Sequence, residues 1–152
     1  MRIHLGSDHG GVALRRVLAA HLREAGHPIV SETGPEDAAT SIDYPDVAID
    51  VCARVLADRG DADPQALGIL VCGTGQGMAI AANKVQGIRA AVVSDPFSAR
   101  MARVHNDANI LCLGERVLGV ELAKILVDEF LRASFAGGRH ARRVAKLERP
   151  RE

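Results

Sequence analysis

Aromatic residues are scarce in this 152-residue chain, which has no Trp, one Tyr and three Phe. Proteins that bind single-stranded nucleic acids stack bases on aromatic side chains, so this composition disfavours a nucleic-acid partner. An excess of one charge is missing as well, because Lys and Arg together number 19 and Asp and Glu together also number 19. Charge balance with 47% hydrophobic residues is typical of a globular domain.

Cysteine is also rare, with Cys52, Cys72 and Cys112 far apart in the chain. An odd number of widely spaced cysteines indicates reduced thiols rather than a disulfide framework or a CxxC metal site. No apolar run is long enough to span a bilayer, and the first residues lead into a predicted strand without the pattern of a signal peptide. We therefore expect a cytoplasmic protein with neither a metal nor a membrane partner.

Two apolar periodicities alternate along the chain. Short apolar runs predict five strands, at residues 2–6, 28–32, 68–71, 89–93 and 109–113. Helical spacing predicts helices up to Gly26, from Tyr44, at 78–84, at 96–103 and after Gly119, with polar connections at 33–43 and 58–65.

Parallel strands need crossover connections, and the predicted helices supply them. The pattern therefore favours an α/β fold, a three-layer α/β/α Rossmann-like or flavodoxin-like domain with a five-stranded parallel sheet. The length fits one domain. We assign that domain to residues 1–136 and treat residues 137–152 as a basic C-terminal helix or tail.

A glycine-rich loop at residues 72–77 follows the third predicted strand. Gly73, Gly75 and Gly77 let the backbone approach a ligand closely, and the following helix start has N–H groups without intrahelical partners. Such a loop can cradle an anion. It matches neither the GxGxxG fingerprint, since position 78 is Met, nor a P-loop, which needs Lys and Ser or Thr. A glycine-rich turn beside a structural cysteine remains the alternative.

Cys72 opens this loop, and a thiol near a helix N-terminus ionises more readily, which suits a general base. Free cysteine also acts as a small buried hydrophobe, and Cys52 and Cys112 fit that role. Parallel sheets bind ligands at the carboxyl ends of their strands, where Asp8 and His9 would join Cys72. Asp8 has an alternative role as a helix N-cap that leaves His9 in solvent.

The C-terminal part of the chain is basic. Its cationic candidates are Arg139, His140, Arg142, Arg143, Lys146, Arg149 and Arg151. A solvated basic helix or a nucleic-acid contact would explain these residues, whereas Arg139 and Arg143, at i and i+4, can clamp a phosphate. With few aromatic residues nearby, we favour the phosphate of a small molecule. His105 ends a predicted helix, where a histidine can simply complement the helix dipole.

Several motifs follow one another along nearly the whole chain. They are Ser-Asp-His-Gly-Gly at 7–11, Asp-Tyr-Pro-Asp at 43–46, Cys-Gly-Thr-Gly-Gln-Gly at 72–77, Ala-Ala-Asn-Lys at 81–84, Gly-Ile-Arg-Ala at 87–90, His-Asn-Asp-Ala-Asn at 105–109, Leu-Gly-Glu-Arg at 113–116 and Gly-Gly-Arg-His at 137–140. In this order they resemble the ribose-5-phosphate isomerase B family, which also includes galactose 6-phosphate and allose 6-phosphate isomerases. The resemblance implies interconversion of an aldose phosphate and a ketose phosphate, without a metal or an organic cofactor.

The resemblance also assigns the chemistry. It implies that Cys72 moves a proton between C1 and C2 through a cis-enediolate, while Thr74 and the backbone amides of Gly73, Gly75 and Gly77 stabilise the enediolate oxygens. His105 would assist ring opening. Some relatives have serine at position 72 and a glutamate base at position 76. Here Gln76 cannot accept the proton, so the thiol is expected to be the base.

The remaining roles concern binding. The resemblance implies that Asp8 and Asn106 handle sugar hydroxyls and that the phosphate is held by His9, Arg116, Arg139 and Arg143. It implies a homodimer with shared active sites, with a tetramer as a further option, in which the 105–116 region and the tail arginines face the partner's cysteine loop.

Other functions remain open at this stage. The connections at 33–43 and 58–66 are somewhat longer and more polar than is usual in the family. The preferred sugar can therefore differ, and other sugar phosphates remain alternative substrates. The same fold also suits a non-catalytic sugar-phosphate sensor. A thiol redox protein is disfavoured, because no second cysteine lies near Cys72 in the sequence.

Overall fold

A single sheet of five parallel strands, in the order β2-β1-β3-β5-β4, runs through the centre of the computed structural model, which describes residues 1–61 and 63–148. The strands are β1 (Ile3–Ser7), β2 (Ile29–Thr33), β3 (Leu67–Cys72), β4 (Ala90–Val92) and β5 (Ile110–Gly114). Every residue of β1, β3 and β5 is buried, as expected for parallel strands covered on both faces.

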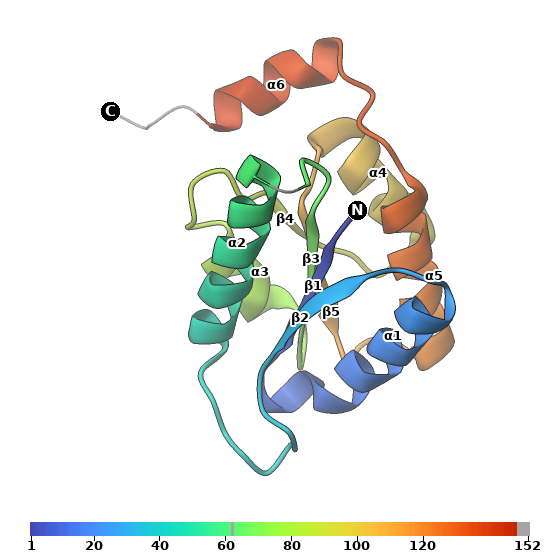
Figure 1. Ribbon diagram of the computed structural model, residues 1–152. Helices are drawn as coiled ribbons and strands as arrows, with labels where there is room; N and C mark the ends of the chain where they lie inside the picture. The colour runs from blue at the N-terminus through green and yellow to red at the C-terminus, as the bar shows by residue number, and fades with distance from the viewer. Residues whose placement is uncertain (62, 149–152) are drawn as a thin grey trace.

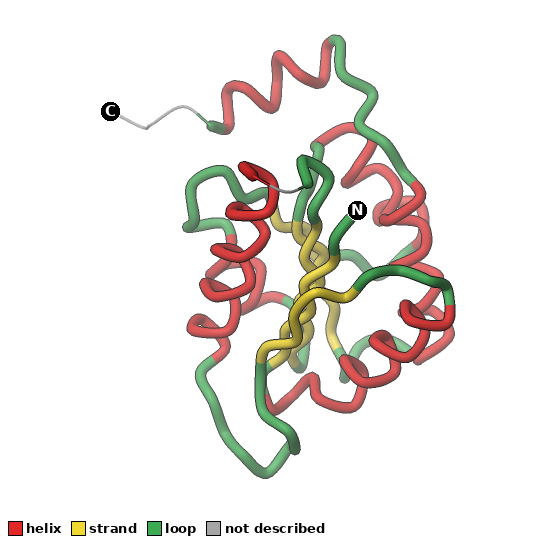
Figure 2. The backbone as a smooth tube through the Cα atoms, viewed as in Figure 1, coloured by secondary structure: helices red, strands yellow, loops and turns green. Residues whose placement is uncertain are grey.

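Helices cover both faces of this sheet (Figures 1 and 2). They are α1 (Val12–Glu24), α2 (Tyr44–Asp61), α3 (Gln76–Ala82), α4 (Pro96–Asn106) and α5 (Val120–Arg132). A 3-10 helix η1 (His9–Gly11) precedes α1, and α6 (Arg139–Leu147) lies apart from the sheet (Figure 1). The apolar cores form one cluster beneath α1, α4 and α5 and another beneath α2 and α3. The predicted three-layer α/β/α fold is confirmed.

The pairing register brings strand ends together. Val71 of β3 lies opposite Ser7 of β1 and Leu113 of β5, and Cys72 lies opposite Gly114. The residues that follow these three strands therefore start from one edge, which we call the carboxyl edge. The opposite, amino edge holds the chain's N-terminus and the end of α4, and α6 extends beyond it (Figure 1).

Several boundaries differ from the sequence prediction, with consequences for the site. Helix α2 continues to Asp61, so part of the connection predicted at 58–65 is helical. Helix α4 continues to Asn106, which places His105 in its last turn. Helix α3 begins at Gln76 instead of Met78, which shortens the glycine loop. In the described part of the chain, no helix combines the length and the apolar character needed to cross a bilayer.

A buried histidine explains why the end of α2 is fixed to the sheet. His4 of β1 is only 4% exposed, and its Nδ1 and Nε2 lie 2.8 Å from Ser31 Oγ and 2.9 Å from Asp58 Oδ2. Arg2 Nε also donates to Asp58 Oδ2, at 2.6 Å. Burial lowers the pKa of His4 below 6.5, although the hydrogen bond to Asp58 opposes this effect.

Because the pKa of His4 is lower in the folded protein, the unfolded chain binds this proton more readily as the pH falls below about 6.5. Acidification from pH 7.5 to 5.5 should therefore lower the stability of the wild-type protein. We expect the melting temperature to fall more steeply with pH in the wild type than in His4→Gln, which lacks the titrating group. Parallel curves in calorimetric scans across this range would contradict the assignment.

Candidate active site

Three polar segments meet at the carboxyl edge, after β1, β3 and β5. Asp8 is buried, and its Oδ1 accepts a hydrogen bond from Gly10 N at 2.8 Å, so it caps η1. A Cβ placed on Gly10 would lie 3.3 Å from Asp8 Oδ1 and 3.2 Å from Gly73 N. Asp8 is thus a cap and also a neighbour of the cysteine loop. His9 follows in η1, where its Nδ1 lies 3.4 Å from Ile42 N.

Cys72 is the last residue of β3 and is 6% exposed. The loop folds back over its sulfur, and Gly75 N–H donates to Cys72 Sγ at 3.1 Å. Gly75 adopts a left-handed conformation, with φ of 79°, which a glycine accepts without strain. Thr74, between them, is exposed at the edge.

Arg116 belongs to this loop in its own chain. Its backbone N donates to Gly73 O at 3.0 Å, and Glu115 N donates to Cys72 O at 2.9 Å. A Cβ on Gly73 would lie 3.5–3.6 Å from Arg116 side-chain atoms. This differs from the expectation that the whole 105–116 region faces a partner's loop. The physical reason is that β5 pairs directly with β3, so the residues leaving β5 emerge beside Cys72.

The other predicted residues lie at the amino edge. His105 and Asn106 end α4, and the His105 ring stacks on the His140 ring with centroids 4.3 Å apart and planes 6° from parallel. These three residues and Arg143 line a pocket between α4 and α6. Arg139 and Arg143 are exposed on α6. Residues Arg139–Leu147 of the basic segment form α6, whereas Arg149 and Arg151 lie outside the described residues.

The two groups are separated by the length of the sheet. The five residues of β5 between them span about 16 Å, at about 3.3 Å per residue. Cys72 and His105 of one chain therefore do not meet on one small substrate. The structure brings together Asp8, His9, Cys72 and Arg116, and separately His105, Asn106, Arg139 and Arg143.

The loss of hydration at the ring stack lowers the pKa of His140, and the positive charges of His105, Arg139 and Arg143 lower it further. The amino-edge group therefore concentrates positive charge around a histidine that resists protonation. This environment suits the binding of an anion such as a phosphate.

Sequence reasoning missed three residues that shape these groups. Tyr44 covers the start of α3, because a Cβ on Gly77 would lie 2.9–3.2 Å from its ring atoms. Glu115 Oε2 accepts from Leu14 N at 2.8 Å and so caps the first turn of α1. His140 stacks on His105. Tyr44, Glu115 and His140 all belong to sequence motifs, but their contacts join segments that are far apart in the sequence.

Within residues 1–61 and 63–148, the structure gathers no group of three or more His, Cys, Asp or Glu side chains that would hold a metal ion.

Comparisons with known proteins agree with this architecture. The family model described as Ribose/Galactose Isomerase matches residues 3–147. The Ribose-5-phosphate isomerase B of Escherichia coli (strain K12) is 46% identical over 146 residues, which cover 96% of this chain and 93% of that protein.

Two solved structures are similar throughout. The Ribose-5-Phosphate Isomerase B of Clostridium thermocellum is 50% identical, with a TM-score of 0.90 and coverage of 97% of this chain and 95% of that one. The Ribose-5-phosphate Isomerase B of Mycoplasma genitalium, solved with bound Ribulose-5-phosphate, is 39% identical, with a TM-score of 0.88 and coverage of 97% and 93%.

A methyl group at Gly114 tests the packing of the cysteine loop. A Cβ there would lie 2.7–2.8 Å from backbone atoms of Thr74, so we expect Gly114→Ala to destabilise the protein by about 1–3 kcal/mol. Gly60→Ala is the matched control, because it meets no atom within 4 Å and replaces a helical glycine. Urea denaturation of both variants checks this. If Gly114→Ala were as stable towards urea as Gly60→Ala, the loop and β5 would not be in close contact.

Proposed function

Because the chain belongs to the ribose/galactose isomerase family, we propose that it interconverts ribose 5-phosphate and ribulose 5-phosphate, with Cys72 as the base. The main support for this role of Cys72 is the hydrogen bond from Gly75 N–H to its sulfur, 3.1 Å long, at the carboxyl edge. The names of the relatives and the ribulose 5-phosphate bound to the Mycoplasma genitalium protein favour this pentose phosphate.

In the open-chain aldose, the Cys72 thiolate removes the proton from C2. The electron pair of that bond forms the C1–C2 double bond of a cis-enediolate, with negative charge on the C1 oxygen. The thiol then returns the proton to C1, and the C2 hydroxyl proton moves to the C1 oxygen, which leaves the ketose. Gln76 has no carboxylate for the first step, so the sulfur is the base that the loop supplies.

Some backbone N–H groups of the glycine loop bind groups within the loop, and the others can bind the substrate. Gly75 N–H already contacts Cys72 Sγ, and Gln76 N lies 3.4 Å from Thr74 Oγ1. We therefore assign the enediolate oxygens to Thr74 and to the remaining amides of the loop, including those of Gly73 and Gly77. Helix α3 has only seven residues, so these local donors matter more than a helix dipole.

We also propose that each site uses two copies of the chain. The length of β5 between the two groups, about 16 Å at about 3.3 Å per residue, supports this arrangement. In it, His105 of the second copy assists ring opening, and its Asn106 joins Asp8 at the sugar hydroxyls. His9 and Arg116 then hold the phosphate together with Arg139 and Arg143 of the second copy.

Apolar side chains near the carboxyl edge support self-association as well. Ile80 of α3 is 62% exposed and Val117, next to Arg116, is 59% exposed. A second copy that covers them would bury apolar surface and would bring its α6, within the 137–152 tail, towards the cysteine loop. Pairing of such dimers into a tetramer would leave this arrangement unchanged.

Replacement of the thiol tests the base. We expect wild-type kcat/KM to be higher for ribose 5-phosphate than for galactose 6-phosphate or allose 6-phosphate, and Cys72→Ala to lose about 100-fold or more on ribose 5-phosphate. Cys52→Ala, which removes a buried sulfur from α2, should keep kcat near the wild-type value. Near-wild-type turnover by Cys72→Ala would refute the role of the thiol, and substrate recovered unchanged by wild type would favour a sensor.

Mixed dimers test the shared site. Cys72→Ala and His105→Ala should each be nearly inactive alone. A statistical mixture should regain about a quarter of wild-type activity, because half of its dimers are mixed and each mixed dimer has one intact site. The control adds wild-type chains to a Cys72→Ala, His105→Ala double variant, which cannot gain an extra site. No recovery after confirmed subunit exchange would show that one chain supplies both residues.

A further inference from the structure

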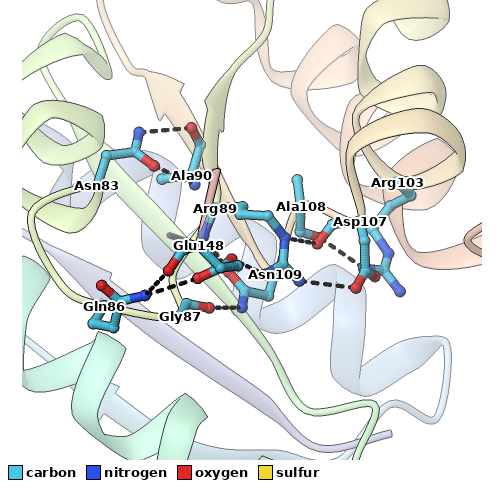
Figure 3. Close-up of polar contacts among 10 residues, drawn as sticks. All are labelled: Asn83, Gln86, Gly87, Arg89, Ala90, Arg103, Asp107, Ala108, Asn109 and Glu148. Atoms are coloured by element: carbon cyan, nitrogen blue, oxygen red, sulfur yellow. Dashed lines mark hydrogen bonds and ion pairs between the residues drawn. The ribbon is translucent and has the colours of Figure 1, made fainter. Parts of the chain in front are cut away.

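Arg89, at the amino edge, connects three segments that are distant in the sequence (Figure 3). Its Nε donates to Asp107 O at 2.9 Å, one terminal nitrogen donates to Asp107 Oδ2 at 2.8 Å, and the other donates to Glu148 Oε1 at 2.6 Å. The side chain of Arg89 is 15% exposed, so these bonds are shielded from water more than a surface pair is. The start of β4, the end of α4 and the end of α6 therefore meet at one guanidinium.

Asp107, which Arg89 binds at the end of α4, has an unusual backbone conformation. Asp107 has φ of 47°, the only positive φ outside glycine in residues 1–61 and 63–148, and it follows directly after His105 and Asn106. A left-handed conformation disfavours most side chains, so the turn needs compensating bonds. Arg103 adds a second clamp, donating to Asp107 Oδ1 at 2.9 Å and to Ala108 O at 2.7 Å.

Helix α6 lacks the usual anchor of a helix, because none of its residues is buried. At its beginning it is held by the ring stack of His140 on His105. At its end, Glu148 accepts from Arg89, and Gln86 Nε2 donates to Glu148 O and Oε2, both at 3.1 Å. Figure 3 shows Arg89 and Gln86 converging on Glu148 from two sides. Polar contacts at its two ends thus hold this helix.

We propose that the Arg89–Glu148 ion pair positions α6 so that Arg139 and Arg143 are ready to receive the substrate phosphate. Arg89 is suited to this task because its planar guanidinium donates to two carboxylates at once, Asp107 at the end of α4 and Glu148 at the end of α6. The compact ammonium group of a lysine lacks this forked geometry. The inference rests on the proposed function for its substrate. It adds a residue pair that touches neither the reacting atoms nor the phosphate.

The pair should act on binding and leave the chemical step alone. Without it, the end of α6 is free to fray, and ordering the helix then opposes each binding event. The base, Cys72, lies at the other edge of the sheet and keeps its surroundings. Loss of the pair should therefore raise KM and weaken phosphate binding, with little change in kcat.

Glu148→Gln tests this, because it removes the charge and keeps the size of the side chain. We expect KM for ribose 5-phosphate to rise about 3- to 10-fold, kcat to stay within about twofold, and the Kd of inorganic phosphate to rise in parallel. Backbone amides of α6 should exchange faster with deuterium. Glu121→Gln is the matched control: it breaks an exposed pair with Lys124 on α5 and should change none of these values.

Two results would overturn the proposal. One is wild-type exchange in α6 of Glu148→Gln, which would show that the pair does not hold the helix. The other is faster exchange with unchanged KM and phosphate affinity, which would show that the position of α6 does not govern binding. If the wild-type protein does not convert ribose 5-phosphate, the proposed function fails, while the exchange and phosphate measurements still decide the role of Glu148.

Discussion

The pairing of β3 with β1 on one side and β5 on the other is the interaction on which the rest of the structure depends. Its register sets Cys72 opposite Gly114, and the hydrogen bonds from Glu115 N to Cys72 O and from Arg116 N to Gly73 O continue this pairing past the end of β5. A shift of β5 along β3 would move Arg116 away from the cysteine loop. The register of the sheet therefore determines which residues lie next to the cysteine loop.

Three thiols are buried in the same apolar layer but occupy different positions in the fold. Cys52, Cys72 and Cys112 belong to one cluster, and burial raises the pKa of Cys52 to about 12 and that of Cys112 well above its usual value. The position of Cys72 is different, because it ends its strand and accepts the N–H of Gly75. The role proposed for Cys72 therefore depends on its place at the end of the strand, since the residue type is the same in all three.

The sequence was sufficient for the local features and for the fold class. Apolar periodicity predicted all five strands, and glycine spacing predicted the loop after Cys72, because these features depend on residues close together in the chain. The direct pairing of β5 with β3, which sets Arg116 against the cysteine loop of its own chain, could not be predicted, because β5 inserts between β3 and β4, against the order of the chain. The end of α2 was misjudged too, since Asp58 is held by Arg2 and His4 from the far N-terminus.

The crowding of backbone around the cysteine loop has a consequence for how this protein can diverge. A Cβ on Gly11 would lie 2.5 Å from Val71 O, and one on Gly114 would lie 2.7 Å from Thr74 C. Backbone atoms of β3 and of the cysteine loop therefore leave no room for a side chain at Gly11 or Gly114. The loop at 33–43 and α6 carry mostly exposed side chains, so substitutions there disturb the packing of the protein less.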